Sequence, residues 1–171
     1  FKMKKKIAIL GSTGSIGKNL INILKKEKNK FQVQLLSAHK DHVTLLKQVK
    51  EFNVKNIIIS DPSSYLILKK KIKNLNINIF NNYKKLDTIF KKRIDYVMSS
   101  ITGVDGLYPT INIIKHTKKI AIANKEAIIC GWHIIEKDLK KFKTTFVPVD
   151  SEHFSIFYAL KGNKISNINK I

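Results

Sequence analysis

The stretch "KKKIAILGSTGSIGKNLINIL", Lys4–Leu24, decides the fold of this chain. An apolar run suited to a β-strand, residues 5–10, leads into three glycines spaced G-x-x-G-x-x-G at Gly11, Gly14 and Gly17. Ile16, Leu20, Ile23 and Leu24 then recur at helical spacing. The stretch therefore predicts a strand, a tight glycine turn and a helix.

A turn of this kind after a strand is a variant of the dinucleotide-binding fingerprint. Glycines let the backbone approach a pyrophosphate, and the following helix offers free N–H groups and the positive end of its dipole. Thr13 and Ser15 add hydroxyl donors. The alternative is a tight turn that holds no ligand.

Strand-like and helix-like patterns alternate along the chain, which is typical of a parallel sheet with crossover helices. Pro62 and Pro109 mark two helix starts, where a first-turn position needs no N–H. We expect an α/β, Rossmann-like, doubly wound and mainly parallel sheet with helices on both faces. The predicted strands are residues 5–10, 32–37, 56–60, 77–80, 96–99, 119–123 and 145–147.

Cofactor choice is read at the end of the second strand, in "SAHKDH". A carboxylate there binds the ribose hydroxyls of NAD, whereas a cation accommodates the extra phosphate of NADP. Lys40 and His39 favour NADP, although Asp41 beside them complicates the choice. An ordinary loop histidine is an equally good interpretation of His39.

The composition excludes some classes of protein. The formal net charge of +21 would suit a nucleic-acid partner. However, the lysines are scattered along the chain, and we expect compositional drift and no nucleic-acid partner. The single cysteine, Cys130, excludes an internal disulfide and a cysteine-rich zinc site.

No segment predicts a membrane or secretory protein. No apolar run approaches the roughly 18 residues of a membrane span, and the run at residues 7–10 is too short for a signal peptide. We expect no membrane association and a cytoplasmic location. A plastid location stays open if a transit peptide was removed.

An acidic pair follows the last predicted strand, in "VPVDSEH". Asp150 and Glu152 are two residues apart, so in an extended segment both carboxylates point to one side, which suits a hard divalent cation. Two carboxylates rarely complete a coordination shell. On spacing alone, a solvated loop acid and a helix-capping acid remain the better interpretation.

Four motifs together carry a resemblance to a known family. "GSTGSIG" (11–17), "ITGVDGLYPT" (101–110), "AIANKEAI" (121–128) and "VPVDSEH" (147–153) stand in the order found in 1-deoxy-D-xylulose-5-phosphate reductoisomerases. The glycine motif is shared by many dehydrogenases, whereas "ANKE" followed by "PVDSEH" is far more specific. The resemblance spans essentially the whole chain but covers only the amino-terminal part of a family member.

The resemblance assigns roles to particular residues. It implies an NADPH site, substrate contacts and two metal ligands, Asp150 and Glu152, for Mg²⁺, Mn²⁺ or Co²⁺. The implied NADPH contacts are Thr13, Gly14, Ser15, Ile16, His39, Lys40, Asp41, Asn124 and Glu126. The implied substrate contacts are Lys125, Ser151 and Glu152, with Lys125 and Glu152 as catalytic residues.

The resemblance also implies an activity and a domain organisation. The reaction is the NADPH- and metal-dependent conversion of 1-deoxy-D-xylulose 5-phosphate, a phosphorylated sugar, to 2-C-methyl-D-erythritol 4-phosphate in non-mevalonate isoprenoid biosynthesis. Full-length members are implied to be homodimers. We expect an NADPH-binding domain at residues 1–147 and the start of a truncated catalytic domain at 148–171, with the remaining site residues beyond Ile171, so that the fragment itself only binds NADPH.

Two other functions stay open at this point. Another NADP-dependent two-domain oxidoreductase, such as a semialdehyde dehydrogenase, would need a cysteine nucleophile, and Cys130 lacks the expected surroundings. A basic nucleic-acid-binding protein with a Rossmann-like scaffold would explain the charge, but no clustered, aromatic-interleaved basic patch supports it.

Overall fold

The computed structural model describes residues 3–149, 154–155 and 158. In this part of the chain, seven strands form one sheet in which every pair is parallel. The strands are β1 (Lys5–Leu10), β2 (Phe31–Ala38), β3 (Asn56–Ile59), β4 (Asn78–Phe80), β5 (Ile94–Ser99), β6 (Thr117–Ile122) and β7 (Thr145–Pro148). The predicted doubly wound α/β fold is confirmed.

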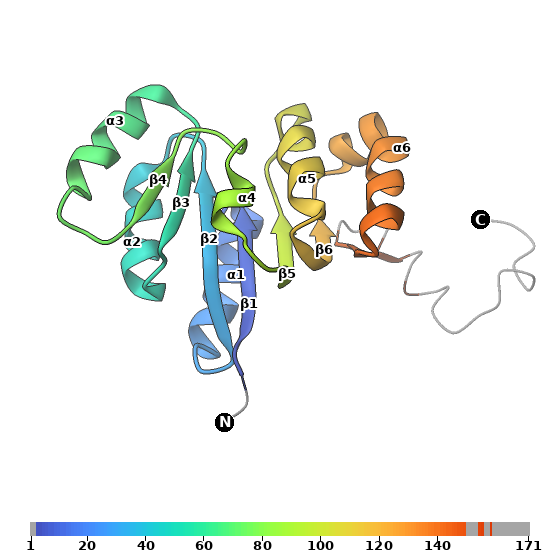
Figure 1. The fold of residues 1–171 in the computed structure, drawn as a ribbon, viewed down its shortest axis with the longest axis horizontal. Helices are drawn as coiled ribbons and strands as arrows, with labels where there is room; N and C mark the ends of the chain where they lie inside the picture. Colours follow the sequence, from blue (N-terminus) through green and yellow to red (C-terminus); the bar gives the residue numbers. More distant parts are fainter. Residues whose placement is uncertain (1–2, 150–153, 156–157, 159–171) are drawn as a thin grey trace, which may run out of the picture.

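The strand order places the glycine turn, residues 11–17, at the end of the central strand of the sheet, β1. The order is β4-β3-β2-β1-β5-β6-β7, so the chain winds outward from β1 on one side and then returns to build the other side from β5 (Figure 1). The direction of winding reverses between β1 and β5. Open α/β sheets bind ligands at this point, beyond the carboxyl ends of the strands.

Helices cover both faces of the sheet (Figure 1). Alternate residues of β1 serve two separate cores: Ile7 and Ile9 lie in one, and Ala8 and Leu10 lie in the other. The first core is closed by α1 (Ser15–Lys26), α2 (His42–Phe52) and α3 (Pro62–Lys71), and the second by α4 (Leu86–Ile89), α5 (Leu107–Ile114) and α6 (Lys125–Phe142). A short 3-10 helix, η1 (Val104–Gly106), precedes α5.

The predicted helix starts are confirmed, whereas the predicted buried faces are only partly right. Pro62 is the first residue of α3, and the Asp61 carboxylate caps that helix by accepting from the Ser64 amide at 2.9 Å. Pro109 lies in the first turn of α5. In α1, however, Ile16 and Ile23 are exposed, because the buried side of the helix is formed by Gly17, Ile21 and Leu24.

Three strands begin earlier than the sequence predicts. β2 starts one residue early, at Phe31, and β5 and β6 each start two residues early, at Ile94 and Thr117, because these two residues pair with each other in the sheet. The α4 helix was not predicted. Pro148 pairs with Ile122 as the last residue of β7, so the sheet reaches one residue past the proposed boundary at 147. The division into domains stays a prediction.

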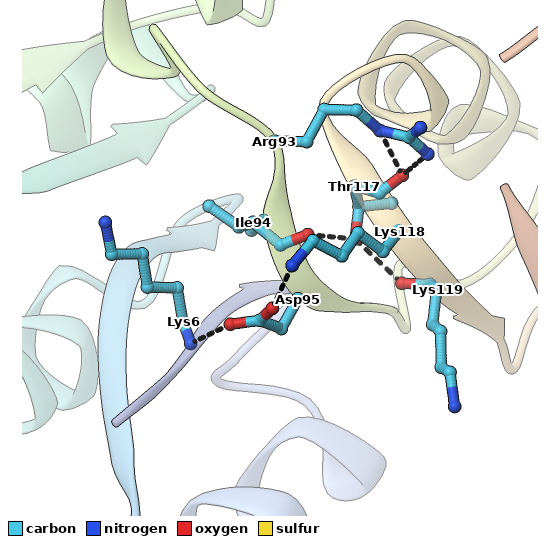
Figure 2. Close-up of polar contacts among 7 residues, drawn as sticks. All are labelled: Lys6, Arg93, Ile94, Asp95, Thr117, Lys118 and Lys119. Atoms are coloured by element: carbon cyan, nitrogen blue, oxygen red, sulfur yellow. Dashed lines mark hydrogen bonds and ion pairs between the residues drawn. The ribbon is translucent and has the colours of Figure 1, made fainter. Parts of the chain in front are cut away.

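The amino ends of the central strands are joined by polar contacts (Figure 2). The Asp95 carboxylate accepts from the Lys6 amide at 2.9 Å and from the Lys118 ammonium at 2.8 Å. Arg93 donates from Nε, at 3.0 Å, and from Nη2 to the Thr117 carbonyl. These contacts tie β1, β5 and β6 together at the edge opposite the glycine turn.

Three ion pairs on the surface of the domain lie among solvent-exposed side chains. Lys25 and Lys28 both pair with Glu51, and Lys30 pairs with Glu27, all with partly or largely exposed side chains. Exposed pairs of this kind contribute little to stability, about 0 to 1 kcal/mol each. None of the described helices has the length and apolar character that crossing a membrane requires.

Candidate functional site

The glycine turn between β1 and α1 is dictated by close packing at its first and third glycines. Gly11 has φ +79°, and a Cβ there would lie 2.7 Å from the Ser100 carbonyl oxygen. A Cβ on Gly17 would overlap the Gly11 carbonyl and lie 2.6 Å from the Ser12 Cα. Both positions therefore need glycine for the fold itself.

The middle glycine is different, because the chain gives no steric reason for it. Gly14 has φ −74° and ψ 173°, an extended conformation that any residue adopts. An added Cβ would meet the Gly11 oxygen at 3.5 Å, an ordinary van der Waals contact. A glycine at this exposed position leaves room for another group to approach the backbone, as a pyrophosphate does in the dinucleotide fingerprint.

The start of α1 is open at the same place. Gly14 is the N-cap residue, and no side chain caps the helix. The first amides of a helix have no acceptor within it, and they carry the positive end of the dipole. Ser15 and Ile16, in this first turn, are exposed, and Thr13 is half-buried. The structure thus brings together the four predicted phosphate-binding residues, 13–16.

Buried hydrogen bonds hold the turn from behind. The Ser12 hydroxyl donates to Gln48 Oε1 at 2.7 Å, and Gln48 Nε2 donates to the Ser12 carbonyl at 2.9 Å. The Ser12 amide donates to the Ser37 carbonyl at 2.8 Å. On the β5 side, the Ser100 hydroxyl donates to the Leu10 carbonyl at 2.8 Å. The turn is therefore fixed before any ligand arrives.

A cleft of about 510 Å³ opens above this turn, at the carboxyl ends of β1, β2, β3 and β5. It lies where the winding of the sheet reverses, as the fold class predicts. Its lining residues are Gly11, Thr13, Gly14, Ala38, His39, Ser60, Tyr83, Ser100, Ile101, Thr102, Asp105, Tyr108 and Pro109.

Two basic residues, His39 and Lys40, lie at the β2 end of the cleft. His39 lines it, and its Nδ1 lies 2.9 Å from the Ser60 hydroxyl at the end of β3. Lys40 is exposed beside it, and its side chain makes no hydrogen bond or ion pair to any described residue. This pair is available to an anionic group.

Asp41, the third residue predicted here, has a structural partner. Its carboxylate caps α2 by accepting from the Thr44 amide at 2.9 Å. Burial raises the pKa of Asp41, but the hydrogen bonds from Thr44 and the charge of Lys18 outweigh it and lower the pKa overall. The carboxylate is thus charged and engaged with the helix, and a cofactor contact for it stays a prediction.

Asn124 is also occupied by the chain. It is 3% exposed, and its Oδ1 accepts from the Ala127 amide at 3.0 Å, which caps α6. Its Nδ2 donates to the carbonyls of Ile101, at 2.5 Å, and Gly103, at 2.6 Å. Asn124 therefore holds the loop that forms the β5 side of the cleft, a role that its motif alone did not reveal.

Lys125 and Glu126 follow in the first turn of α6, and both are exposed. Neither side chain has an ion-pair partner within the described residues. β6 and β7 are paired up to Ile122 and Pro148, so α6 begins at the same edge of the sheet at which β7 ends. That arrangement leaves Lys125 free for another group.

The predicted metal ligands Asp150 and Glu152, and the predicted substrate contact Ser151, lie outside the described residues. Residues 3–149, with 154–155 and 158, contain no cluster of three or more histidine, cysteine or acidic side chains that could hold a metal ion. The metal site therefore stays a prediction.

Sequence reasoning missed several residues of the cleft wall. Ser60, Ser100 and Thr102 each follow a strand end, which is a signal that could have found them. Tyr83 and Tyr108 carry no such signal, because a segment between β4 and α4 and the start of α5 bring them in from elsewhere.

Comparison with known proteins agrees with this geometry. A sequence profile of the 1-deoxy-D-xylulose 5-phosphate reductoisomerase family matches residues 7–131. The reductoisomerase of Pelagibacter ubique is 57% identical over 98% of this chain, and that of Clostridium kluyveri is 41% identical over 98%. The chain spans 44% of the length of each of these relatives.

Solved structures of the same enzyme share the fold. The reductoisomerase from Zymomonas mobilis in complex with NADPH superposes with a TM-score of 0.83 at 30% identity, covering 91% of this chain and 41% of that one. A reductoisomerase in complex with NADPH, fosmidomycin and magnesium gives 0.83 at 30% identity, covering 93% and 40%. The sheet, the glycine turn and these matches lead to one conclusion: the chain belongs to the 1-deoxy-D-xylulose 5-phosphate reductoisomerase family.

Proposed function

We propose that the described domain binds NADPH and that the full-length protein converts 1-deoxy-D-xylulose 5-phosphate to 2-C-methyl-D-erythritol 4-phosphate with a divalent metal ion. The observation that carries the proposal is the open cradle at Gly14, where the chain gives no steric reason for glycine and the α1 amides are uncapped. The family's solved structures with NADPH support it.

The residues around the turn fit a dinucleotide. Thr13, Gly14, Ser15 and Ile16 would hold the pyrophosphate through backbone amides and hydroxyls, which needs no charged side chain because the helix dipole favours an anion. The cleft volume of about 510 Å³ is within the usual range for small-molecule sites. When bound, NADPH supplies the hydride, and the chain's task is to orient it.

NADPH is favoured over NADH by the charges at the end of β2. Lys40 and His39 would contact the adenosine phosphate that NADH lacks. Asp41 does not argue against this preference, since its carboxylate is engaged with the Thr44 amide of α2. Asn124 and Glu126 complete the proposed cofactor contacts. Asn124 also positions residues 101–103, which border the cleft, through its hydrogen bonds to the carbonyls of Ile101 and Gly103.

The catalytic end of the site is proposed from the family motifs. Asp150 and Glu152 would hold Mg²⁺, Mn²⁺ or Co²⁺, which supplies Lewis acidity, and Ser151, Glu152 and Lys125 would contact the substrate. Lys125 would offer positive charge where an oxyanion develops. The exposed position of Lys125 at the start of α6 supports this role.

The assembly and location are proposed on the same basis. We expect a full-length homodimer in the cytoplasm that binds neither nucleic acid nor membranes. Light scattering on the full-length protein would measure its mass directly. A monomer, or binding to duplex DNA that falls steeply with salt, would contradict this expectation.

The proposal is tested by titrating the 171-residue chain with NADPH and with NADH, before and after Lys40→Ala. NADPH should bind more tightly, and the substitution should weaken NADPH by about tenfold through loss of a charge-assisted contact, with NADH unchanged. Lys50→Ala, an exposed lysine at the far end of α2, is the matched control. Equal affinity for both nucleotides, or no binding of either, would contradict the proposal.

A further inference from the structure

A buried chain of hydrogen bonds links the cleft wall to the glycine turn. Tyr83 donates from its hydroxyl to Ser37 Oγ at 2.9 Å, and the Gly11 amide donates to the same oxygen at 3.1 Å. Ser37 lies in β2, and Tyr83 lies in the segment between β4 and α4. The three residues are far apart in sequence, so the fold alone brings them together.

One of these two hydrogen bonds is buried and the other is partly buried, so losing either of them would leave a polar group unpaired and at least partly shielded from water. Ser37 is 0% exposed and Tyr83 is 8% exposed, packed in the same core as Leu10 and Leu35. Burial raises the pKa of Tyr83 to about 12, against the lowering effect of the Ser37 contact. The phenol is therefore a neutral donor at physiological pH. An unpaired polar group at this depth would be costly.

Ser37 acts as the relay in this arrangement. A hydroxyl oxygen has two lone pairs, and here one accepts from Tyr83 and the other from Gly11. With both filled, the serine is held in one rotamer. Without the tyrosine hydroxyl, the serine side chain is free to turn away from the Gly11 amide.

We propose that Tyr83 is a positioning residue for the cofactor: through Ser37 it holds Gly11 and thereby the phosphate-binding turn. The inference rests on the proposed NADPH function for its consequence on affinity. Tyr83 and Gly11 both line the cleft, so a ligand that contacts the tyrosine ring also acts on the turn.

Tyr83 differs from the other groups that hold the turn. Gln48 and Ser100 hold it from α2 and from β5, elements that pack directly on β1 or on the turn. Tyr83 comes from a segment outside the sheet, and its hydroxyl is linked to the turn through Ser37. Its effect should therefore disappear when Ser37 cannot accept, which a merely packing role would not do.

The test is a double-mutant cycle in the 171-residue chain with Tyr83→Phe and Ser37→Ala. Tyr83→Phe removes only a hydroxyl, and NADPH should bind about fivefold more weakly, the size that one net hydrogen bond supports. Added to Ser37→Ala, it should cost nothing further. The control is Tyr96→Phe, at a half-buried tyrosine of β5 whose hydroxyl makes no hydrogen bond to a described residue, and it should leave affinity unchanged.

A second measurement separates this proposal from the NADPH proposal. In the ligand-free chain, the Gly11 amide should exchange its hydrogen about fivefold faster after Tyr83→Phe, while β-strand amides away from the turn keep their protection. This result would support the positioning role even if NADPH did not bind. Unchanged Gly11 exchange, or additive effects of the two substitutions on affinity, would overturn it.

Discussion

The sheet has an amino edge, where its strands begin, and a carboxyl edge, where they end, and the polar groups at these two edges are arranged differently. At the amino edge, the polar groups satisfy one another: Asp95 accepts from Lys6 and Lys118, and Arg93 donates to the Thr117 carbonyl (Figure 2). At the carboxyl edge, no side chain caps α1, and Lys40 makes no hydrogen bond or salt bridge to a described residue. One sheet thus has a closed end and an open end.

This difference separates structural polar groups from functional ones. At the amino edge, the polar groups of Lys6, Arg93, Asp95, Thr117 and Lys118 are paired within the chain. The exception among the described residues is His116, directly before β6, whose Nε2 is buried without a hydrogen-bond partner. At the carboxyl edge, the first amides of α1 and the Lys40 ammonium can still bind a ligand. Substitutions at the amino edge should therefore change stability, and those at the exposed part of the carboxyl edge should change NADPH affinity.

The sharpest test compares two glycines three residues apart. Gly17→Ala should lower the free energy of unfolding by about 3 kcal/mol, because its Cβ would overlap the Gly11 carbonyl in a rigid turn. Gly14→Ala should leave stability unchanged but weaken NADPH binding by about tenfold, or ~1.4 kcal/mol. Urea unfolding and nucleotide titration measure the two effects. If Gly14→Ala destabilised the chain as much as Gly17→Ala, glycine at position 14 would be required by the fold and not by a ligand.

A second test concerns the amino edge alone. Arg93→Lys keeps the charge but loses the planar donor that reaches both the Thr117 carbonyl and, at 2.8 Å, the Thr144 hydroxyl. We expect a loss of about 1.5 kcal/mol in the free energy of unfolding. NADPH affinity should not change.

Lys92→Ala, at the exposed position before Arg93, is the control and should shift stability by less than about 0.5 kcal/mol. Thermal and urea unfolding of the variants would give both numbers. A fall in NADPH affinity on Arg93→Lys at unchanged stability would show that the two edges are coupled.

The smallest expected effect is the pH dependence at Asp95. The contacts from Lys118 and from the Lys6 amide lower its pKa below the ordinary value of 3.8, more than burial raises it. Because the folded pKa is depressed, the carboxylate stabilises the fold above pH 3.8, and this contribution is lost as the pH falls through the folded pKa. Asp95→Asn should therefore cost about 0.5 kcal/mol at neutral pH and nothing in strong acid.

Unfolding measured across this pH range would check the expectation, with Asp138→Asn as a control carboxylate that has no ion pair among the described residues. A stability difference that stayed constant down to strong acid would assign the effect of Asp95→Asn to packing.

The sequence predicted the elements whose signals are local. Neighbouring residues alone indicate the glycine turn and the apolar strand before it, and β1 matches its predicted range of 5–10. Asp61 and Pro62 likewise marked the start of α3. The first residues of β5 and β6 were missed because their strand character comes from pairing with each other: Ile94 is a single apolar residue before the polar Asp95, and Thr117 is polar.

The site was predictable where backbone chemistry decides it, and less so where tertiary contacts do. Thr13, Gly14 and Ser15 were predicted from the glycine turn, and Ile16 from the family resemblance. All four lie at the uncapped start of α1, and their contact with a phosphate stays a prediction. The buried cap at Asn124 and the relay from Tyr83 depend on contacts between segments far apart in sequence. The cap that Asp41 forms on α2 was not predicted either, and the predicted cofactor contact of Asp41 stays a prediction.

Arg93 is the single arginine in a chain of 171 residues with 33 basic side chains. Dicarbonyl reagents that modify guanidinium groups therefore have one target, and that target is held at the amino edge by Thr117 and Thr144. Because Arg93 is exposed, the labelling rate then reports how firmly these two contacts hold the guanidinium group in the native protein. A nucleotide bound at the opposite edge would slow the labelling only if it stiffens the whole sheet, so one covalent reaction measures how far rigidity spreads through the domain.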